Sequence, residues 1–158
     1  MSTNYSLTSI FCDDIRHEIN GKMSLMGIYS GDMYVPDFPI TLPKICAFFE
    51  LRSPLNIPSS TDVRLTVIKG TEKINSITLT IPPTNTESIS PHGKPFAYFR
   101  TLGGMEFPSM TFAEPVLIEV VAEVDGQSII GGRLWVSKFP QGVEAGSPTP
   151  TKKSNKRS

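Results

Sequence analysis

The sequence predicts an all-β protein: an antiparallel β-sandwich of eight or nine strands, of the Ig-like or C2-like kind. Three observations predict it. Apolar and polar side chains alternate over most of the chain, turn dipeptides separate the alternating runs, and most of the 14 prolines stand between those runs. No window of eleven or more residues shows the 3.6-residue period of an amphipathic helix, and strands without crossover helices pack as antiparallel sheets.

The alternation locates the strands in chain order. Residues 116–124 carry an apolar side chain at every second position, which predicts one fully apolar face. Residues 63–67 and 77–81 alternate in the same way, and β-branched and aromatic residues, which favour strands, are frequent in these runs. We therefore expect strands at about 5–12, 22–29, 32–35, 45–52, 62–70, 73–81, 95–102, 115–124 and 128–138.

Two dipeptides predict tight hairpins. Asn20-Gly21 and Asp125-Gly126 suit two-residue type I′ turns, which need positive φ at both central positions. Gly70-Thr71-Glu72 is expected to close a third hairpin. The register implied by a two-residue loop at Asn20-Gly21 places charged side chains on an apolar face, and a one-residue slip exchanges the two faces. We therefore expect an irregularity, a β-bulge, near Asp13-Asp14.

Length and composition fit one domain followed by a tail. The chain has 158 residues, and 15 basic against 15 acidic residues give a formal net charge of zero. From residue 142 onward the chain is rich in Pro, Ser and Thr and holds one large aliphatic side chain, so it buries too little to offset the entropy of ordering. We expect a β-sandwich domain at 1–141 and a disordered basic tail at 142–158. Without the four basic residues of the tail, 11 basic against 15 acidic residues give a net charge of −4.

Several classes of function lack support in the sequence. The chain starts without the basic and apolar segments of a signal peptide, and its apolar runs are too short to cross a bilayer, so we expect no membrane contact. Cys12 and Cys46 are too few for a disulfide framework, so we expect buried free thiols and a cytoplasmic protein. The neutral charge balance argues against nucleic-acid binding beyond weak contacts of the tail. Neither a Gly-x-Ser-x-Gly elbow nor a P-loop is present, and we expect no cofactor.

The densest polar cluster lies at the end of the first strand. Asp13, Asp14, His17 and Glu18 supply three carboxylates and an imidazole, which suit a divalent metal or another ligand. The competing interpretation is structural: the aspartates cap a turn or pair with Arg16, and the other two side chains line a solvent-facing strand. A hydrolase built on scattered carboxylates is a third alternative, which needs a deep pocket with at least two acids.

Two apolar segments between strands are the predicted partner-binding surface. Residues 103–112 hold two Met and two Phe, and residues 31–40 form a similar segment between prolines. Such segments either plug one end of the sandwich or expose an apolar patch to a partner. On the second interpretation the partner-binding residues are Met105, Phe107, Met110, Phe112, Met33 and Phe38. Trp135 is expected in the core, and Gly131-Gly132 is expected to let another strand or a ligand approach closely.

One stretch of the sequence carries a resemblance. Residues 11–29, FCDDIRHEINGKMSLMGIY, resemble the opening of a family of small uncharacterised proteins from bacteria and some phages. The residues that match the shared pattern are Asp13, Asp14, Gly21, Lys22 and Gly27. The resemblance extends more loosely to about residue 138. It implies a small all-β domain without an assigned activity, and it therefore assigns no functional residue.

These observations lead to an expected function. We expect a small, cytoplasmic, non-enzymatic binding module whose partner is another protein. The resemblance allows a sharper version, in which a protein of phage or mobile-element origin acts on a host protein. Self-association through an open sheet edge is an alternative. The alternative functions are a ligand- or metal-binding domain that uses the Asp13-Asp14 end, and a hydrolase with a carboxylate site.

Overall fold

The computed structural model describes residues 5–84, 93 and 98–140. Most of these residues lie in nine strands, and the short 3₁₀ turn η1 spans Ile19–Gly21. The strands are β1 (Ser6–His17), β2 (Met23–Ile28), β3 (Asp32–Val35), β4 (Ile40–Ser53), β5 (Thr61–Lys69), β6 (Glu72–Ile81), β7 (Phe99–Phe112), β8 (Val116–Val124) and β9 (Gln127–Lys138). Within this described part of the chain, no helix has the length and apolar character needed to cross a bilayer.

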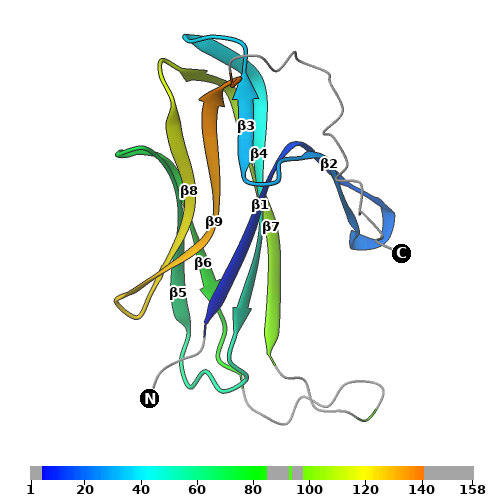
Figure 1. Ribbon diagram of the computed structural model, residues 1–158. Coiled ribbons are helices and arrows are strands. Elements are labelled where there is room, and N and C mark those ends of the chain that lie inside the picture. The colour runs from blue at the N-terminus through cyan, green and yellow to red at the C-terminus, as the bar shows by residue number, and fades with distance from the viewer. Residues whose placement is uncertain (1–4, 85–92, 94–97, 141–158) are drawn as a thin grey trace, which may run out of the picture.

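The strands form two sheets that pack face to face (Figure 1). Sheet A has the strand order β2-β1-β4-β7, and sheet B has the order β3-β9-β8-β5-β6. All pairs are antiparallel except β3 and β9, which run parallel. The predicted all-β sandwich is therefore confirmed, and the parallel pair is an addition that the sequence did not indicate.

Alternation along the strands builds one core between the sheets. In β8, Ile118, Val120, Ala122 and Val124 are buried. Sheet A supplies facing side chains such as Phe49, which is also buried. Removing a Val, Leu, Ile or Phe side chain from water contributes about 1.5–3 kcal/mol, so these alternating positions supply the main stabilisation of the fold.

The double glycine of β9 brings the two sheets close together. A Cβ atom at Gly132 would collide with the backbone and hydroxyl of Ser9 in β1, and a Cβ atom at Gly131 would collide with the Leu7 side chain. The expectation that Gly131-Gly132 admits a close neighbour is confirmed, and that neighbour is a strand of the opposite sheet.

Two of the three predicted hairpins form at the predicted turns. Asp125 and Gly126 have φ values of 50° and 73° and form a two-residue loop between β8 and β9. Gly70 and Thr71 join β5 to β6, whereas Glu72, which was expected in this loop, begins β6. Positive φ at both Asp125 and Gly126 matches the right-handed twist of the flanking strands, which is why Asp-Gly predicted the turn correctly.

The register predicted for the first hairpin is wrong by one residue. The chain turns through η1, and His17 pairs with Met23. Arg16 consequently faces Ser24 instead of Leu25, which removes the conflict between a charge and an apolar face. Cys12 pairs with Ile28 and Asp14 pairs with Met26, so the register of β1 against β2 is the same on both sides of Asp13. The β-bulge expected near Asp13-Asp14 therefore does not shift the register of this pair.

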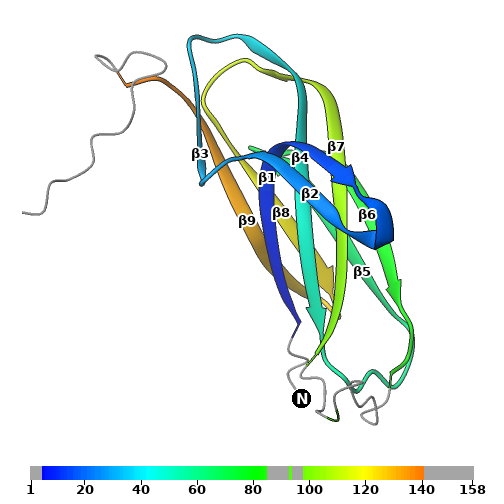
Figure 2. The same cartoon turned by 90° about the vertical axis from the view of Figure 1, so that its right-hand side faces the viewer.

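The β1–β2 hairpin folds over the outer face of sheet A. The pairing of β1 with β4 ends at Cys12, and from there β1 pairs only with β2, which crosses in front of β4 and β7 (Figure 2). A second, smaller apolar cluster forms beneath it. Its buried residues are Cys12, Ile15 and Cys46, and Met23, Leu25 and Phe48 pack against them.

The segment predicted as an apolar loop is a strand. Residues 103–112 form the second half of β7, which pairs with β4 along its length. Gly104 lies beneath Ile15, where a Cβ atom would collide with that side chain. Pro108 stands on an edge strand, where a missing N–H group is tolerated. Likewise β4 begins at Ile40, earlier than predicted, and the predicted tail at 142–158 lies outside the described residues.

Candidate functional site

The Asp13-Asp14 segment holds its two carboxylates in different environments. The carboxylate of Asp14 accepts hydrogen bonds from Lys44 Nζ, in β4, and from Arg16 Nε at 3.1 Å. These two cations hold the pKa of Asp14 below its ordinary value, and the hydrogen bond to Asp14 raises the pKa of Lys44. The segment therefore joins the first hairpin to the middle of sheet A by a charged contact.

Asp13 turns the other way, toward Tyr29. The Tyr29 hydroxyl donates a hydrogen bond of 2.5 Å to Asp13 Oδ1. Burial, and then this bond to a carboxylate, raise the pKa of Tyr29 above its ordinary value, so the phenol stays a donor at physiological pH. Gly27 has a φ of 64°, and any Cβ atom there would collide with the Asp13 carboxylate. Asp13 and Gly27, which both match the family pattern, thus pack against each other in the folded protein.

The four predicted metal ligands do not converge. Asp13 and Asp14 are engaged as described, His17 is exposed at the end of β1, and Glu18 accepts a hydrogen bond of 2.9 Å from Ser24 Oγ. The sequence placed them together because they are neighbours in the chain, whereas the strand directs them to different partners. Among the described residues, these four side chains do not form one group of ligands, and a ligand site at the Asp13-Asp14 end stays a prediction.

A different set of potential ligands does meet around Asp14. Among the residues that the structure describes, Asp14, Cys46 and Glu106 are the one group of three whose ligand atoms all lie within 4.8 Å of one another. Lys44 lies against this group: its pKa is raised by Asp14 and, to a smaller extent, by the charges of Cys46 and Glu106. The Lys44 ammonium pairs with Asp14 and so already places a positive charge beside this group, whose third member, Glu106, is exposed.

The predicted partner-binding residues lie mainly in the core. Met105 and Phe107, and then Met110 and Phe112, take inward positions of β7, with a change of phase at Ser109, whose φ is 55°; all four pack between the sheets, together with Met33 of β3. Phe38 is half-buried against the same core. The prediction that these side chains form an exposed surface is wrong: five of the six are buried, because strand alternation turns them inward on each side of the phase change at Ser109.

The structure exposes a different set of aromatic side chains. Trp135, expected in the core, is 45% exposed, because its neighbours Leu134 and Val136 take the inward positions of β9. Tyr34 of β3 is 46% exposed and stacks on Phe139 at a ring distance of 5.9 Å. Leu117 of β8 pairs directly with Trp135. We call Tyr34, Leu117, Trp135 and Phe139 the aromatic surface of sheet B.

The strand pattern contained the signal for this surface. Leu134 and Val136 flank Trp135, so alternation alone places the indole on the face opposite the core. The general preference of tryptophan for burial predicts the core, but the position of Trp135 within the strand decides which face it takes. Tyr34 follows the same rule between Met33 and Val35, which are both buried.

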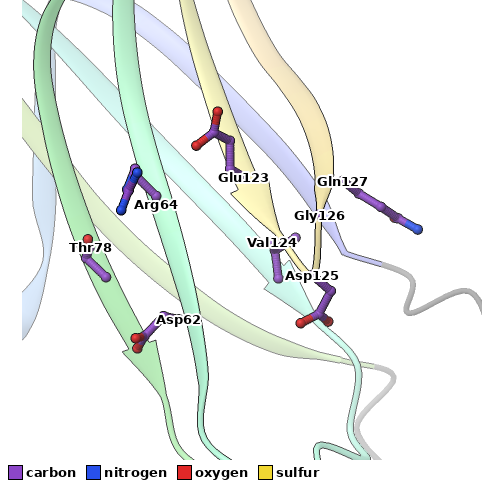
Figure 3. A pocket seen from close by; sticks show the side chains of 8 residues that line it. All are labelled: Asp62, Arg64, Thr78, Glu123, Val124, Asp125, Gly126 and Gln127. Atoms are coloured by element: carbon purple, nitrogen blue, oxygen red, sulfur yellow. The ribbon is translucent and has the colours of Figure 1, made fainter.

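An open polar depression lies at the other end of sheet B. Side chains from β5, β6 and the β8–β9 hairpin surround it (Figure 3), and its volume is about 440 Å³. Three carboxylates, Asp62, Glu123 and Asp125, and the guanidinium group of Arg64 line it. It is a surface feature rather than the deep acidic pocket that a hydrolase would need.

The fold and its surfaces define a small β-sandwich of the uncharacterised class that residues 11–29 indicated. The chain belongs to a family of unknown function, DUF6941, whose model matches residues 7–137. This match runs from β1 to β9 and confirms the expected small all-β domain without an assigned activity. No curated protein matches the chain.

Proposed function

We propose that the protein is a non-enzymatic protein-binding module and that the aromatic surface of sheet B contacts the partner. Trp135 carries the proposal: its indole, on the outside of a sheet, is 45% exposed, which is apolar area that the residues described in the structure leave uncovered. Trp and Tyr are enriched among residues that dominate binding energy, because they bury much area with little loss of side-chain entropy.

The charges of the same face define the chemistry of the partner. Asp32 stands beside Trp135 in the β3–β9 pair, and the depression at the far end carries three carboxylates and one guanidinium group. The ion pair between Arg133 and Glu119, at 2.7 Å, lies between these two regions. A protein that presents an apolar or aromatic side chain next to basic residues complements this surface.

The proposed place of action is the cytoplasm, and the proposed origin is a phage or mobile element that acts on a host protein. Two buried, unbridged thiols suit a reducing compartment. The phage version has the resemblance of residues 11–29 as its support. Alkylation of thiols in intact cells would test the location, because both cysteines should be recovered in the reduced form.

The experiment compares binding by three forms of the full chain. A captured host protein is purified, and its dissociation constant is measured against the wild type, Trp135→Ser and Ile28→Ser. Ile28 is a matched control, since it is also exposed (58%) but lies on β2 of sheet A. We expect Trp135→Ser to weaken binding about tenfold or more, and Ile28→Ser to leave it within about twofold. Equal effects of the two substitutions would contradict the proposal.

Self-association is distinguished in the same series. Sedimentation of the wild type and of Trp135→Ser over a range of concentrations reports whether a second copy occupies the aromatic surface. If the wild type forms a dimer and Trp135→Ser dissociates it, the partner at the aromatic surface is a second copy of the chain and not a host protein.

A further inference from the structure

We propose that Cys12 and Cys46 form a thiol modification site, in which a low-molecular-weight disulfide such as oxidised glutathione joins them into a cross-strand disulfide. This inference is independent of the aromatic surface. It assigns a chemical role to the second apolar cluster, beneath the β1–β2 hairpin.

The register of sheet A places the two cysteines opposite each other. Cys12 in β1 pairs directly with Cys46 in β4, and both side chains lie in the same small cluster. Directly opposed residues of an antiparallel pair have Cα atoms about 4.5–5.5 Å apart. Disulfides need a Cα separation of about 4.4–6.8 Å, so the pair can be bridged without moving the strands apart.

In the reduced protein, side chains of β2 cover the two thiols and shield them from oxidants. Both cysteines are fully buried, and Met23 and Leu25 of β2 pack against them. Burial raises the pKa of Cys12 to about 11, with a further contribution from Cys46, and burial also raises the pKa of Cys46. Because the thiolate is the reacting species, oxidation requires an opening of the cover. The cover is the six-residue strand β2, at the edge of sheet A, which is paired on one side only.

The reaction is a two-step thiol–disulfide exchange. One cysteine thiolate attacks a sulfur of oxidised glutathione, the sulfur–sulfur bond of glutathione breaks, and one glutathione leaves as a thiol after taking up a proton. The second cysteine then attacks the cysteine sulfur of this mixed disulfide, and the second glutathione leaves in the same way. Two electrons and two protons pass from the cysteine pair to oxidised glutathione, which is reduced to two thiols.

Oxidation changes the Asp13-Asp14 segment directly. In the reduced protein, Cys12 Sγ donates to the Asp14 carbonyl at 3.5 Å, and Cys46 Sγ donates to the Asp13 carbonyl at 3.6 Å. A disulfide has no S–H group, so both carbonyls lose these donors. The redox state is thereby coupled to the segment that also contacts Lys44 and Tyr29.

The test treats the full-length protein with oxidised glutathione. We expect intact mass spectrometry to show the loss of two hydrogen atoms, and peptide mapping to join the peptides of Cys12 and Cys46. The Tm of the oxidised wild type should exceed that of the reduced wild type by about 5 °C or more, because the bond restricts the unfolded chain. Cys12→Ala and Cys46→Ala should each retain one bound glutathione instead. A wild type that ends with bound glutathione, with intermolecular dimers or with an unchanged mass would overturn the proposal.

A second pair of variants tests the cover. Leu25→Ser removes a side chain that packs on the cysteines, whereas Met26→Ser changes its exposed neighbour on the same strand. We expect Leu25→Ser to speed disulfide formation several-fold and Met26→Ser to leave the rate unchanged. Equal rates in both variants would overturn the assignment of β2 as the barrier to oxidation.

Discussion

At the scale of single residues, the acidic doublet lies in a cluster whose other members come mainly from distant parts of the chain. Asp13 and Asp14 do organise a cluster, but its other members are Tyr29, Lys44 and the two cysteines. Lys44 and Cys46 come from β4, about 30 residues away in the chain, and the pairing of β1 with β4 brings them there. Local sequence contains no information on that pairing, so it suggested only the neighbours His17 and Glu18 as partners.

The ion pair of Asp14 should be visible in the acid stability of the protein. Lys44 and Arg16 hold the folded-state pKa of Asp14 below its unfolded value, so the unfolded chain binds more protons in this range and stability rises with pH there. The contribution is fully present above the unfolded value of about 4, and it is lost as the pH falls through the folded-state pKa. Between Asp14→Asn and the wild type, we expect a Tm difference that is constant at neutral pH and shrinks below about pH 4.

Lys44→Met provides the matched comparison for this prediction. Since it removes the other half of the same contact, the double variant should lose less stability than the sum of the two single variants. A Tm difference between Asp14→Asn and the wild type that persists unchanged in acid would show that the effect of Asp14 is unrelated to its charge.

At the scale of elements, alternation predicted most strands but failed where glycine and proline interrupt it. Gly103-Gly104 and Pro108 made the second half of β7 look like a loop, although Met105, Phe107 and Met110 occupy inward positions. The glycine at 104 leaves room for the end of the Ile15 side chain of the overlying hairpin, a contact between distant parts of the chain. The strand could therefore be recognised only once the position of β1 was known.

Two substitutions on β7 separate its buried from its exposed face. Met110→Ala empties a buried position and should lower the free energy of unfolding by about 2–5 kcal/mol. Leu102→Ala, at a 45% exposed position of the same strand, should change it by about 0.5 kcal/mol or less. Urea denaturation measures both values. Similar losses would mean that the two faces of β7 are not distinguished by burial.

At the scale of the whole molecule, the sequence predicted the class of fold and left the strand order open. Turn dipeptides connect neighbours such as β8 and β9, and these pairs were predictable. The order β2-β1-β4-β7 depends on pairings between strands that are distant in sequence, and the parallel β3–β9 pair joins residues about 100 positions apart. Strand periodicity predicts that Trp135 lies on the outer face of its sheet. Its neighbours Tyr34 and Leu117 depend on the strand order, which the sequence does not predict.

The boundary of the domain can be tested on the whole molecule. The family match ends at residue 137 and the last strand ends at Lys138. We expect removal of residues 142–158 to change the Tm by about 2 °C or less and to leave the circular-dichroism spectrum of a β protein. The shortened chain should also bind more strongly to an anion exchanger, because it loses the four basic residues at positions 152, 153, 156 and 157. A fall in Tm of about 5 °C or more would place part of that segment in the folded domain.

The position of Trp135 has a practical consequence. It is the single tryptophan of the chain, and it stands on the solvent side of β9 rather than among the packed side chains. Its fluorescence is therefore a poor probe of core unfolding. It is instead a label-free probe of any molecule that binds to that side of the protein. Quenching by a water-soluble agent, with and without a bound molecule, would map occupancy of this face with no chemical tagging.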